Sequence, residues 1–251
     1  MLLLVDAGNT RVKWAAARPG AAAGDWIASG ALAHDELPAL ASQWQSLPLP
    51  LPFTQVLVAN VAGSAVAARI EAALAAAAPQ AGAPHWFRSQ AACAGVVNGY
   101  RDPGQLGCDR FASQIGARHR HPGRALLVVT AGTATTVDAL DASGRFIGGM
   151  ILPGLRTMAQ SLALNTALLP AVDDARTGRL FADNTQEAIV SGCLQAQVGA
   201  ILQAHAQLPS ALCVLSGGAA PYVAPQLPFA CARIDNLVLL GLHVAALTEA
   251  K

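Results

Sequence analysis

One short pattern occurs twice in this chain, with the two copies 124 residues apart. The first copy, Leu3–Thr10, reads Leu-Leu-Val-Asp-Ala-Gly-Asn-Thr, and the second, Leu127–Ala134, reads Leu-Val-Val-Thr-Ala-Gly-Thr-Ala. In each copy an apolar run typical of a buried strand leads into a glycine turn. A merely structural turn has no reason to recur at half the chain length with the same neighbours. The repeat therefore predicts two halves built on one plan.

The residues after each glycine indicate a further strand. A phosphate loop of the P-loop or dinucleotide type is followed by a helix, whereas Val12–Ala15 continues in strand style. In the second copy, Thr135–Leu140 runs into the turn Asp141–Gly144, and Arg145–Gly149 then reads as the returning strand of a β-hairpin. Each half is therefore predicted to place its glycine turn between adjacent antiparallel strands.

The remainder of each half is predicted to alternate helices and strands, which gives an α/β fold. The domains are expected to be 1–117 and 118–251, with the proline-rich stretch 48–52 as a plain connector. The predicted elements are a strand over 55–61, a helix over 65–78 ended by Pro79, a helix begun by Asn184 with Glu187 and ended by Pro209, a strand over 212–215 and a helix over 236–250.

Composition excludes several classes of protein. Hydrophobic residues make up 53% of the chain and charged residues 12%, which rules out disorder. The net charge of +1, with no basic cluster longer than Arg118–His121, does not support nucleic-acid binding. Five cysteines without a CxxC spacing indicate neither a disulfide framework nor a zinc site, and point to a reducing cytoplasm. The charge-free stretch 188–232 is interrupted by glutamines and prolines, so no membrane span is predicted.

The two glycine turns suggest phosphate binding. Backbone N–H groups in such turns point into a concavity that accepts phosphate oxygens, and two facing turns can grip a nucleotide. Asp6 can hold Mg²⁺ through water, because Mg²⁺ keeps several waters and takes few carboxylates. Lys13 can approach the transferred phosphoryl group. The alternative for Asp6 is an ordinary turn-forming aspartate.

Several motifs together resemble a known family, the type III pantothenate kinases, which include the Bvg accessory factor and belong to the acetate and sugar kinase, Hsc70 and actin superfamily. The resemblance runs nearly end to end, and its most specific block is Leu106-Gly-x-Asp-Arg110. The motifs are Asp6–Thr10 with Lys13, Asn98–Tyr100 with Pro103, Leu106–Arg110, Gly132–Thr136 with Asp138, Gly148–Gly149 with Ile151 and Pro153–Gly154, Asn184–Ile189, and Ser216–Ala219.

The resemblance implies duplicated ribonuclease-H-like domains of the actin-like ATPase type, with mixed sheets and a cleft between them. It also implies the residues that bind ATP. In the first half these are Asp6, Ala7, Gly8, Asn9, Thr10, Arg11, Val12 and Lys13, and in the second half Gly132, Thr133, Gly217 and Gly218. Gly217 and Gly218 would pass close to the adenosine, or would simply end a strand.

The resemblance also assigns the residues that meet pantothenate. Asp109 is implied to be the general base that takes or orients the hydroxyl proton, a role that suits phosphoryl transfer, where the protein chiefly positions groups. The alternative is a loop aspartate paired with Arg110. The implied substrate contacts are Tyr100, Gly107, Cys108, Asp109, Arg110 and Thr185. Thr185 would act across a dimer interface; otherwise it is only part of a helix's first turn, and Tyr100 an ordinary half-buried aromatic.

One position departs from the family pattern. Thr130 stands where the family usually has an aspartate associated with a monovalent cation. A neutral hydroxyl does not replace that charge: either the protein dispenses with the monovalent-cation site, or it binds the ion through neutral oxygens alone, and activity is expected to depend only weakly on K⁺ or NH₄⁺. Asp138, eight residues later, is a candidate for partial compensation or else a structural carboxylate.

The resemblance therefore predicts a cytoplasmic homodimer with a shared active site, whose partners are pantothenate and ATP. The reaction is phosphorylation of pantothenate to 4'-phosphopantothenate with Mg²⁺, the first step of coenzyme A biosynthesis. The main alternative is a regulatory or accessory nucleotide-binding protein with little kinase activity. Another small-molecule kinase of the superfamily is disfavoured by the Leu-Gly-x-Asp-Arg block.

Overall fold

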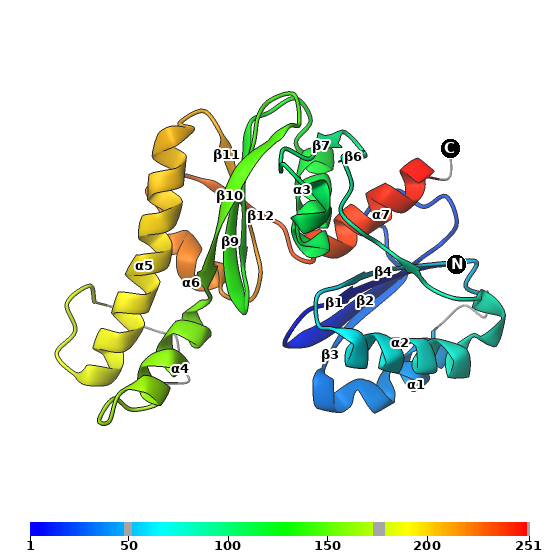
Figure 1. Ribbon diagram of the computed structural model, residues 1–251, viewed down its shortest axis with the longest axis horizontal. Helices are drawn as coiled ribbons and strands as arrows, with labels where there is room; N and C mark the ends of the chain where they lie inside the picture. Colours follow the sequence, from blue (N-terminus) through cyan, green and yellow to red (C-terminus); the bar gives the residue numbers. More distant parts are fainter. Residues whose placement is uncertain (48–51, 173–178, 250–251) are drawn as a thin grey trace. The chain divides into compact units, whose positions relative to one another are not determined.

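The computed structural model describes residues 1–47, 52–172 and 179–249 (Figure 1). Most of the proline-rich stretch 48–52 lies outside the described residues. The chain forms two compact units: a first unit of Met1–Arg120 with Leu237–Lys251, and a second unit of His121–Asn236. The prediction of contiguous domains over 1–117 and 118–251 does not include this return of the C-terminal residues to the first unit.

A five-stranded mixed sheet forms the first unit's centre, in the order β3-β2-β1-β4-β5. The strands are β1 (Leu2–Ala7), β2 (Arg11–Ala17), β3 (Ala28–Ala33), β4 (Gln55–Asn60) and β5 (His85–Trp86). β2 runs antiparallel to both β1 and β3, whereas β1, β4 and β5 run parallel to one another. The β1–β2 hairpin confirms the predicted strand, glycine turn and strand.

The second unit repeats this topology, in the order β10-β9-β8-β11-β12. Its strands are β8 (Leu126–Ala131), β9 (Ala134–Leu140), β10 (Phe146–Pro153), β11 (Leu212–Ser216) and β12 (Cys231–Arg233). Again the first three strands are antiparallel neighbours, and β8, β11 and β12 are parallel. Two sheets with the same strand order and directions confirm the duplicated α/β plan.

Helices cover both faces of the first sheet and one face of the second (Figure 1). In the first unit they are η1 (His34–Ala39), α1 (Leu40–Gln45), α2 (Ser64–Ala77), η2 (Pro79–Ala81), η3 (Pro103–Gln105), α3 (Cys108–Arg120) and α7 (Leu237–Glu249). In the second unit they are α4 (Leu155–Asn165), α5 (Thr185–Gln207), α6 (Ala220–Val223) and η4 (Ala224–Gln226). The short strands β6 (Ala92–Cys93) and β7 (Val96–Val97) form a separate hairpin.

The predicted elements of the alternating regions are confirmed as β4, α2, α5, β11 and α7. The start of α5 is capped as expected, because the Asn184 side-chain oxygen accepts a hydrogen bond from the Glu187 N–H at 3.0 Å. The helices α3 and α4 were not predicted. Among the described residues, no helix has both the length and the apolar character needed to cross a bilayer.

The alternation of side chains along β1 determines what lies on each face of the first sheet. Leu3, Val5 and Ala7 enter an apolar core that also contains Leu40 of α1 and Ile70 of α2. The intervening side chains, Asp6 among them, therefore face the opposite side, where α3 and α7 pack (Figure 1). The carboxyl end of β1 thus presents a carboxylate on the side of the sheet where α3 begins.

Helices α3 and α7 cross closely because each has a glycine at the crossing. A Cβ atom at Gly241 would lie 1.8 Å from the Ala112 carbonyl oxygen, and one at Gly116 would lie 2.7 Å from that of Leu237. The α7 side chains Leu239, Leu240 and Leu242 are buried. This apolar packing explains why the C-terminal helix belongs to the first unit.

Candidate active site

The turn between β1 and β2 is short and held by its own backbone. The Gly8 N–H donates to the Arg11 carbonyl at 3.1 Å, and the Val61 N–H beyond β4 donates to the Ala7 carbonyl at 3.0 Å. Asn9, Thr10 and Arg11 are exposed at the tip. The base of the turn is therefore held by backbone hydrogen bonds, and its tip is exposed to solvent.

Asp6 and Lys13 lie directly opposite each other at the end of this hairpin. Asp6 is 9% exposed, and its burial raises the pKa of the carboxyl group to about 7. The positive charge of Lys13 opposes this rise, and the negative charge of Asp109 adds to it. Asp6, Lys13 and Asp109 therefore form one electrostatically coupled cluster, whose two carboxylates favour a bound cation.

Asp109 lies in the first turn of α3 and not in a loop, and it interacts with Arg110, as the alternative to a catalytic role expects. Its Oδ1 accepts a hydrogen bond from the Arg110 N–H at 2.8 Å. Burial raises the pKa of Asp109, while the hydrogen bond and charge of Arg110 limit the rise. A Cβ atom at Gly107 would lie 2.7 Å from Asp109 Oδ1, so glycine at 107 leaves room for this carboxylate.

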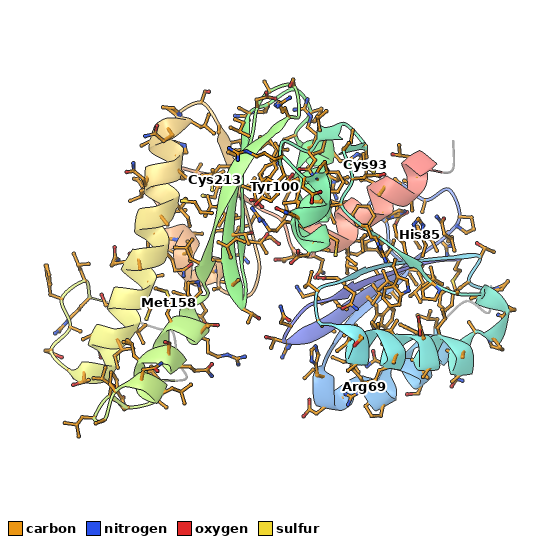
Figure 2. The ribbon with its side chains drawn as sticks, in the orientation of Figure 1. Arg69, His85, Cys93, Tyr100, Met158 and Cys213 are labelled. Atoms are coloured by element: carbon orange, nitrogen blue, oxygen red, sulfur yellow. The ribbon has the colours of Figure 1, made fainter. Side chains whose placement is uncertain are left out.

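Arg110 is buried and held against Tyr100, which is labelled in Figure 2. Its Nη1 donates to the Tyr100 hydroxyl at 3.0 Å, and its guanidinium carbon lies 5.8 Å from the centre of the Tyr100 ring. Asn98 fixes the preceding loop by accepting from the Tyr100 N–H at 3.1 Å and donating to the Pro103 carbonyl at 3.0 Å. Tyr100 is therefore part of an ordered cationic site beside Asp109.

Cys108 joins the start of α3 to the end of β4. Its Sγ donates to the Asn60 carbonyl at 3.7 Å. Burial, reinforced by the nearby charges of Asp109 and Asp6, raises the pKa of this thiol to about 11. The thiol stays protonated at neutral pH and acts as a donor. Asn60 was not predicted as part of the site; the one sequence signal is a polar residue at the end of a buried strand.

The glycine turn of the second unit is held from two sides. The Gly132 N–H donates to the Ala134 carbonyl at 3.0 Å within the turn, and the Ala219 N–H donates to the Ala131 carbonyl at 3.0 Å. Gly217 has a φ of +96°, and a Cβ atom there would lie 2.3 Å from that same Ala131 oxygen. Gly217 is therefore required where β11 ends against this turn, and Gly218 follows it directly.

Thr130 belongs to a row of hydroxyl side chains across the second sheet. It pairs with Ser216 on one side and Thr136 on the other. Within the part of the chain that the structure describes, its buried Oγ1 has no hydrogen-bond partner. Asp138 lies two residues beyond Thr136 on the same face and is also buried. Thr130, Thr136, Ser216 and Asp138 thus lie on one face of the second sheet.

The residues predicted to act in the reaction are thus divided between the units. The first unit brings together Asp6–Lys13, Tyr100 and Gly107–Arg110, and the second brings together Thr130, Gly132, Thr133, Gly217 and Gly218. Thr185 is exposed in the first turn of α5. Across residues 1–47, 52–172 and 179–249 there is no cluster of three or more His, Cys, Asp or Glu side chains suited to a metal ion.

Solved structures share this architecture. One is a putative 2-dehydro-3-deoxygalactonokinase from Sinorhizobium meliloti, with a TM-score of 0.59 and 14% identity over 100% of this chain and 99% of that chain. Another is the activator of 2-hydroxyisocaproyl-CoA dehydratase from Clostridium difficile with bound ADPNP, with a TM-score of 0.53 and 15% identity over 98% and 92%. At these identities the likeness establishes the fold alone.

Sequence comparison gives closer relatives. A type III pantothenate kinase of Herminiimonas arsenicoxydans is 49% identical over 98% of both chains, and one of Aromatoleum aromaticum is 49% identical over 100% of this chain and 99% of its own. The family model for type III pantothenate kinase matches residues 2–207. The chain therefore belongs to the type III pantothenate kinase family.

Proposed function

We propose that this chain transfers the terminal phosphoryl group of ATP to the hydroxyl of pantothenate. The product would be 4'-phosphopantothenate, and the reaction would be the first step of coenzyme A biosynthesis. Family membership supports the proposal. The observation that carries it is the coupled cluster of Asp6, Lys13 and Asp109, where a carboxylate suited to a metal, a cation and a candidate base converge.

ATP would bind through the two glycine turns. Their backbone N–H groups suit phosphate oxygens, and Lys13 lies beside the first turn as a further positive charge. Asp6 fits Mg²⁺, since it is a buried carboxylate whose ionised form lacks hydration and gains from a nearby cation. A bound Mg²⁺ would neutralise part of the negative charge of the phosphates. Asp6 would hold it through water and orient it.

Asp109 would accept or orient the proton of the attacking hydroxyl. Its raised pKa makes it a stronger base than an ordinary aspartate, and its position in the first turn of α3 keeps it partly accessible. The neighbouring Arg110, fixed by Tyr100, would bind the negatively charged end of pantothenate. Gly107 would line the pantothenate site through its backbone. Cys108 would line it too, held in place by its hydrogen bond to the Asn60 carbonyl.

A homodimer is part of the proposal. Large apolar side chains are exposed on β10, on α4 and on the segment before α5: Ile147, Ile151, Leu162, Leu164, Leu168 and Phe181. Leu164, Leu168 and Phe181 are each more than 80% exposed, and exposed large apolar side chains of this kind are typical of surfaces that bind another protein chain. A second copy covering this surface would bury Phe181, and Thr185 would then stand beside the interface.

The five cysteines are all free, as expected for an enzyme of the reducing cytoplasm, where we place the reaction. The site would depend only weakly on K⁺ or NH₄⁺, because Thr130 carries no charge and offers only a neutral oxygen.

The direct test is an ATP-consumption assay with and without pantothenate, with the product identified by mass. We expect ADP formation that requires pantothenate and Mg²⁺, and a product heavier than pantothenate by one phosphoryl group. ATP binding without pantothenate-dependent turnover would favour the regulatory alternative. Turnover with other small alcohols but not with pantothenate would favour a different kinase of the superfamily.

A further inference from the structure

Each of the two glycine turns has a carbonyl oxygen held by a side chain from a later element. In the first turn, His34 Nε2 lies 2.9 Å from the Gly8 carbonyl oxygen. In the second, Thr157 Oγ1 lies 2.7 Å from the Thr133 carbonyl oxygen. Because a carbonyl oxygen only accepts, His34 carries a proton on Nε2, and the Thr157 hydroxyl points at Thr133.

At the second turn the start of α4 packs directly against the carbonyl groups. The Gly154 N–H donates to the Thr133 oxygen at 2.9 Å, so this oxygen accepts two hydrogen bonds, from Gly154 and Thr157. A Cβ atom at Gly154 would lie 2.0 Å from the Gly132 oxygen. Glycine at 154 therefore lets α4 approach closely enough for the Thr157 hydroxyl to reach the turn.

At the first turn His34 is itself held in place. Its own carbonyl accepts from Arg69 Nη1 of α2 at 3.0 Å (Figure 2), and the Ala33 N–H just before it donates to Glu36 Oε2 at 2.7 Å. The imidazole thus extends from a fixed backbone towards the Gly8 carbonyl. The two units use different residue types, histidine and threonine, for this contact. The shared feature is a side-chain donor on a carbonyl oxygen of the glycine turn.

Holding these carbonyl groups has a consequence for the turns. In a planar trans peptide the carbonyl of one residue and the N–H of the next point in opposite directions. A donor on the Gly8 carbonyl therefore fixes the Asn9 N–H, and donors on the Thr133 carbonyl fix the Ala134 N–H. Donors that are oriented before the ligand arrives stabilise its charge without the cost of reorganisation.

We propose that His34 and Thr157 are positioning residues that preset the peptide planes of the two phosphate-binding turns, and so strengthen the binding of ATP. The inference rests on the proposed role of these turns in ATP binding. It concerns two residues outside the sets predicted to bind ATP and pantothenate.

The test compares variants that keep or lose the donor at each position. Thr157→Val removes the hydroxyl with little change of shape, and Thr157→Ser keeps it; His34→Phe removes the donor, and His34→Gln keeps one of similar reach. Thr166→Val is the matched control, because Thr166 ends the same helix and donates to the Leu162 carbonyl at 2.8 Å, away from the turn. The measurements are kcat, the KM for each substrate, and the Kd for ATP by calorimetry.

We expect Thr157→Val and His34→Phe each to raise the KM and Kd for ATP about three- to tenfold, as for the loss of one hydrogen bond. The KM for pantothenate should change less than about twofold, and the donor-keeping variants should recover most of the ATP affinity. The proposal is overturned if Thr157→Val and His34→Phe bind ATP like the wild type, or if Thr166→Val weakens ATP binding equally.

A separate measurement keeps this inference distinct from the proposed site. In the wild-type protein, hydrogen exchange of residues 8–10 and 132–134 should slow when Mg²⁺ and a non-hydrolysable ATP analogue are added. Without such protection, the assignment of these turns to the phosphates fails. With protection but no effect of Thr157→Val and His34→Phe, the turns bind ATP and only the positioning role is wrong.

Discussion

At the scale of single residues, Asp6 lies where a metal-binding carboxylate is proposed, and burying its charge there costs stability. Its carboxyl group is taken out of water at the end of β1, faces Lys13 across the hairpin, and lies close enough to Asp109 for the two charges to repel. The proximity of Asp6 and Lys13 follows from the hairpin, which was predictable. The proximity of Asp109 was not, because it depends on where α3 packs, and no local pattern determines that.

Asp6→Asn should stabilise the metal-free protein at high pH. A folded-state pKa near 7 means that the folded and unfolded chains are both protonated at Asp6 below about pH 4, and that stability is lost as pH rises towards 7. An asparagine does not titrate, so the variant should be more stable at pH 8 by up to about 4 kcal/mol. Urea unfolding with EDTA at pH 4.5 and pH 8 measures this. If the difference in unfolding free energy between Asp6→Asn and the wild type does not grow with pH, the carboxylate of Asp6 is not buried as described.

Thr130→Asp should make the enzyme more dependent on K⁺. A carboxylate beside phosphates is costly unless a cation lies between them, and Thr130 lacks that charge. The measurement is initial rate against K⁺ concentration at constant ionic strength. We expect a nearly flat dependence in the wild type and a steep one in the variant. A wild-type enzyme inactive without K⁺ would mean that the hydroxyl row or Asp138 already builds an ion site.

At the scale of elements, sequence patterns predicted the strands better than the helices around the site. Strands β1 and β8 combine apolar runs with recognisable glycine turns, so their place beside an antiparallel partner could be read from local residues. α3 escaped prediction because its first turn, Cys108–Arg110, looks like a polar loop. α7 was predicted as a helix, but its packing on α3 depends on the glycines at the crossing and on a contact between distant parts of the chain.

Gly241→Ala should destabilise the first unit by about 1–3 kcal/mol or more, because a Cβ atom would overlap the Ala112 backbone. Gly199→Ala is the matched control, since Gly199 also lies inside a helix, α5, and a Cβ atom there meets nothing within 4 Å. Helix propensity alone should make that variant more stable by about 0.5–1 kcal/mol. Urea unfolding of both variants distinguishes the effects. Equal changes in unfolding free energy for the two variants would show that the close crossing of α3 and α7 does not cause the loss of stability in Gly241→Ala.

At the scale of the whole molecule, the chain contains two copies of one sheet topology, and the two copies carry different types of residue at their glycine turns. The first copy holds the charged groups, Asp6, Lys13 and Asp109, whereas the second holds glycines and neutral hydroxyls beside the equivalent turn. The repeat at half the chain length predicted this duplication. Part of the chemical difference lies within the repeat, where Asp6 corresponds to Thr130, whereas Lys13 and Asp109 lie outside the repeated pattern.

Mixing two inactive variants tests the proposed shared site. Asp109→Asn and Thr185→Trp should each be inactive as homodimers, whereas a mixture with exchanged subunits should recover about a quarter of wild-type activity, since each heterodimer contains one site with both good residues. The assay follows activity after subunit exchange, verified by labelled chains. Exchange without recovery would place both residues in one subunit's site or remove Thr185 from it.

The most direct test of the account is the turnover of Asp109→Asn with saturating Mg²⁺, ATP and pantothenate. Asparagine keeps the shape of the side chain but cannot accept the hydroxyl proton, so kcat should fall by about 10² to 10⁴, while the Kd for ATP changes less than about threefold. Circular dichroism of the variant should match the wild type. A kcat near that of the wild type would contradict the central claim that Asp109, at the start of α3, is the base of a pantothenate kinase.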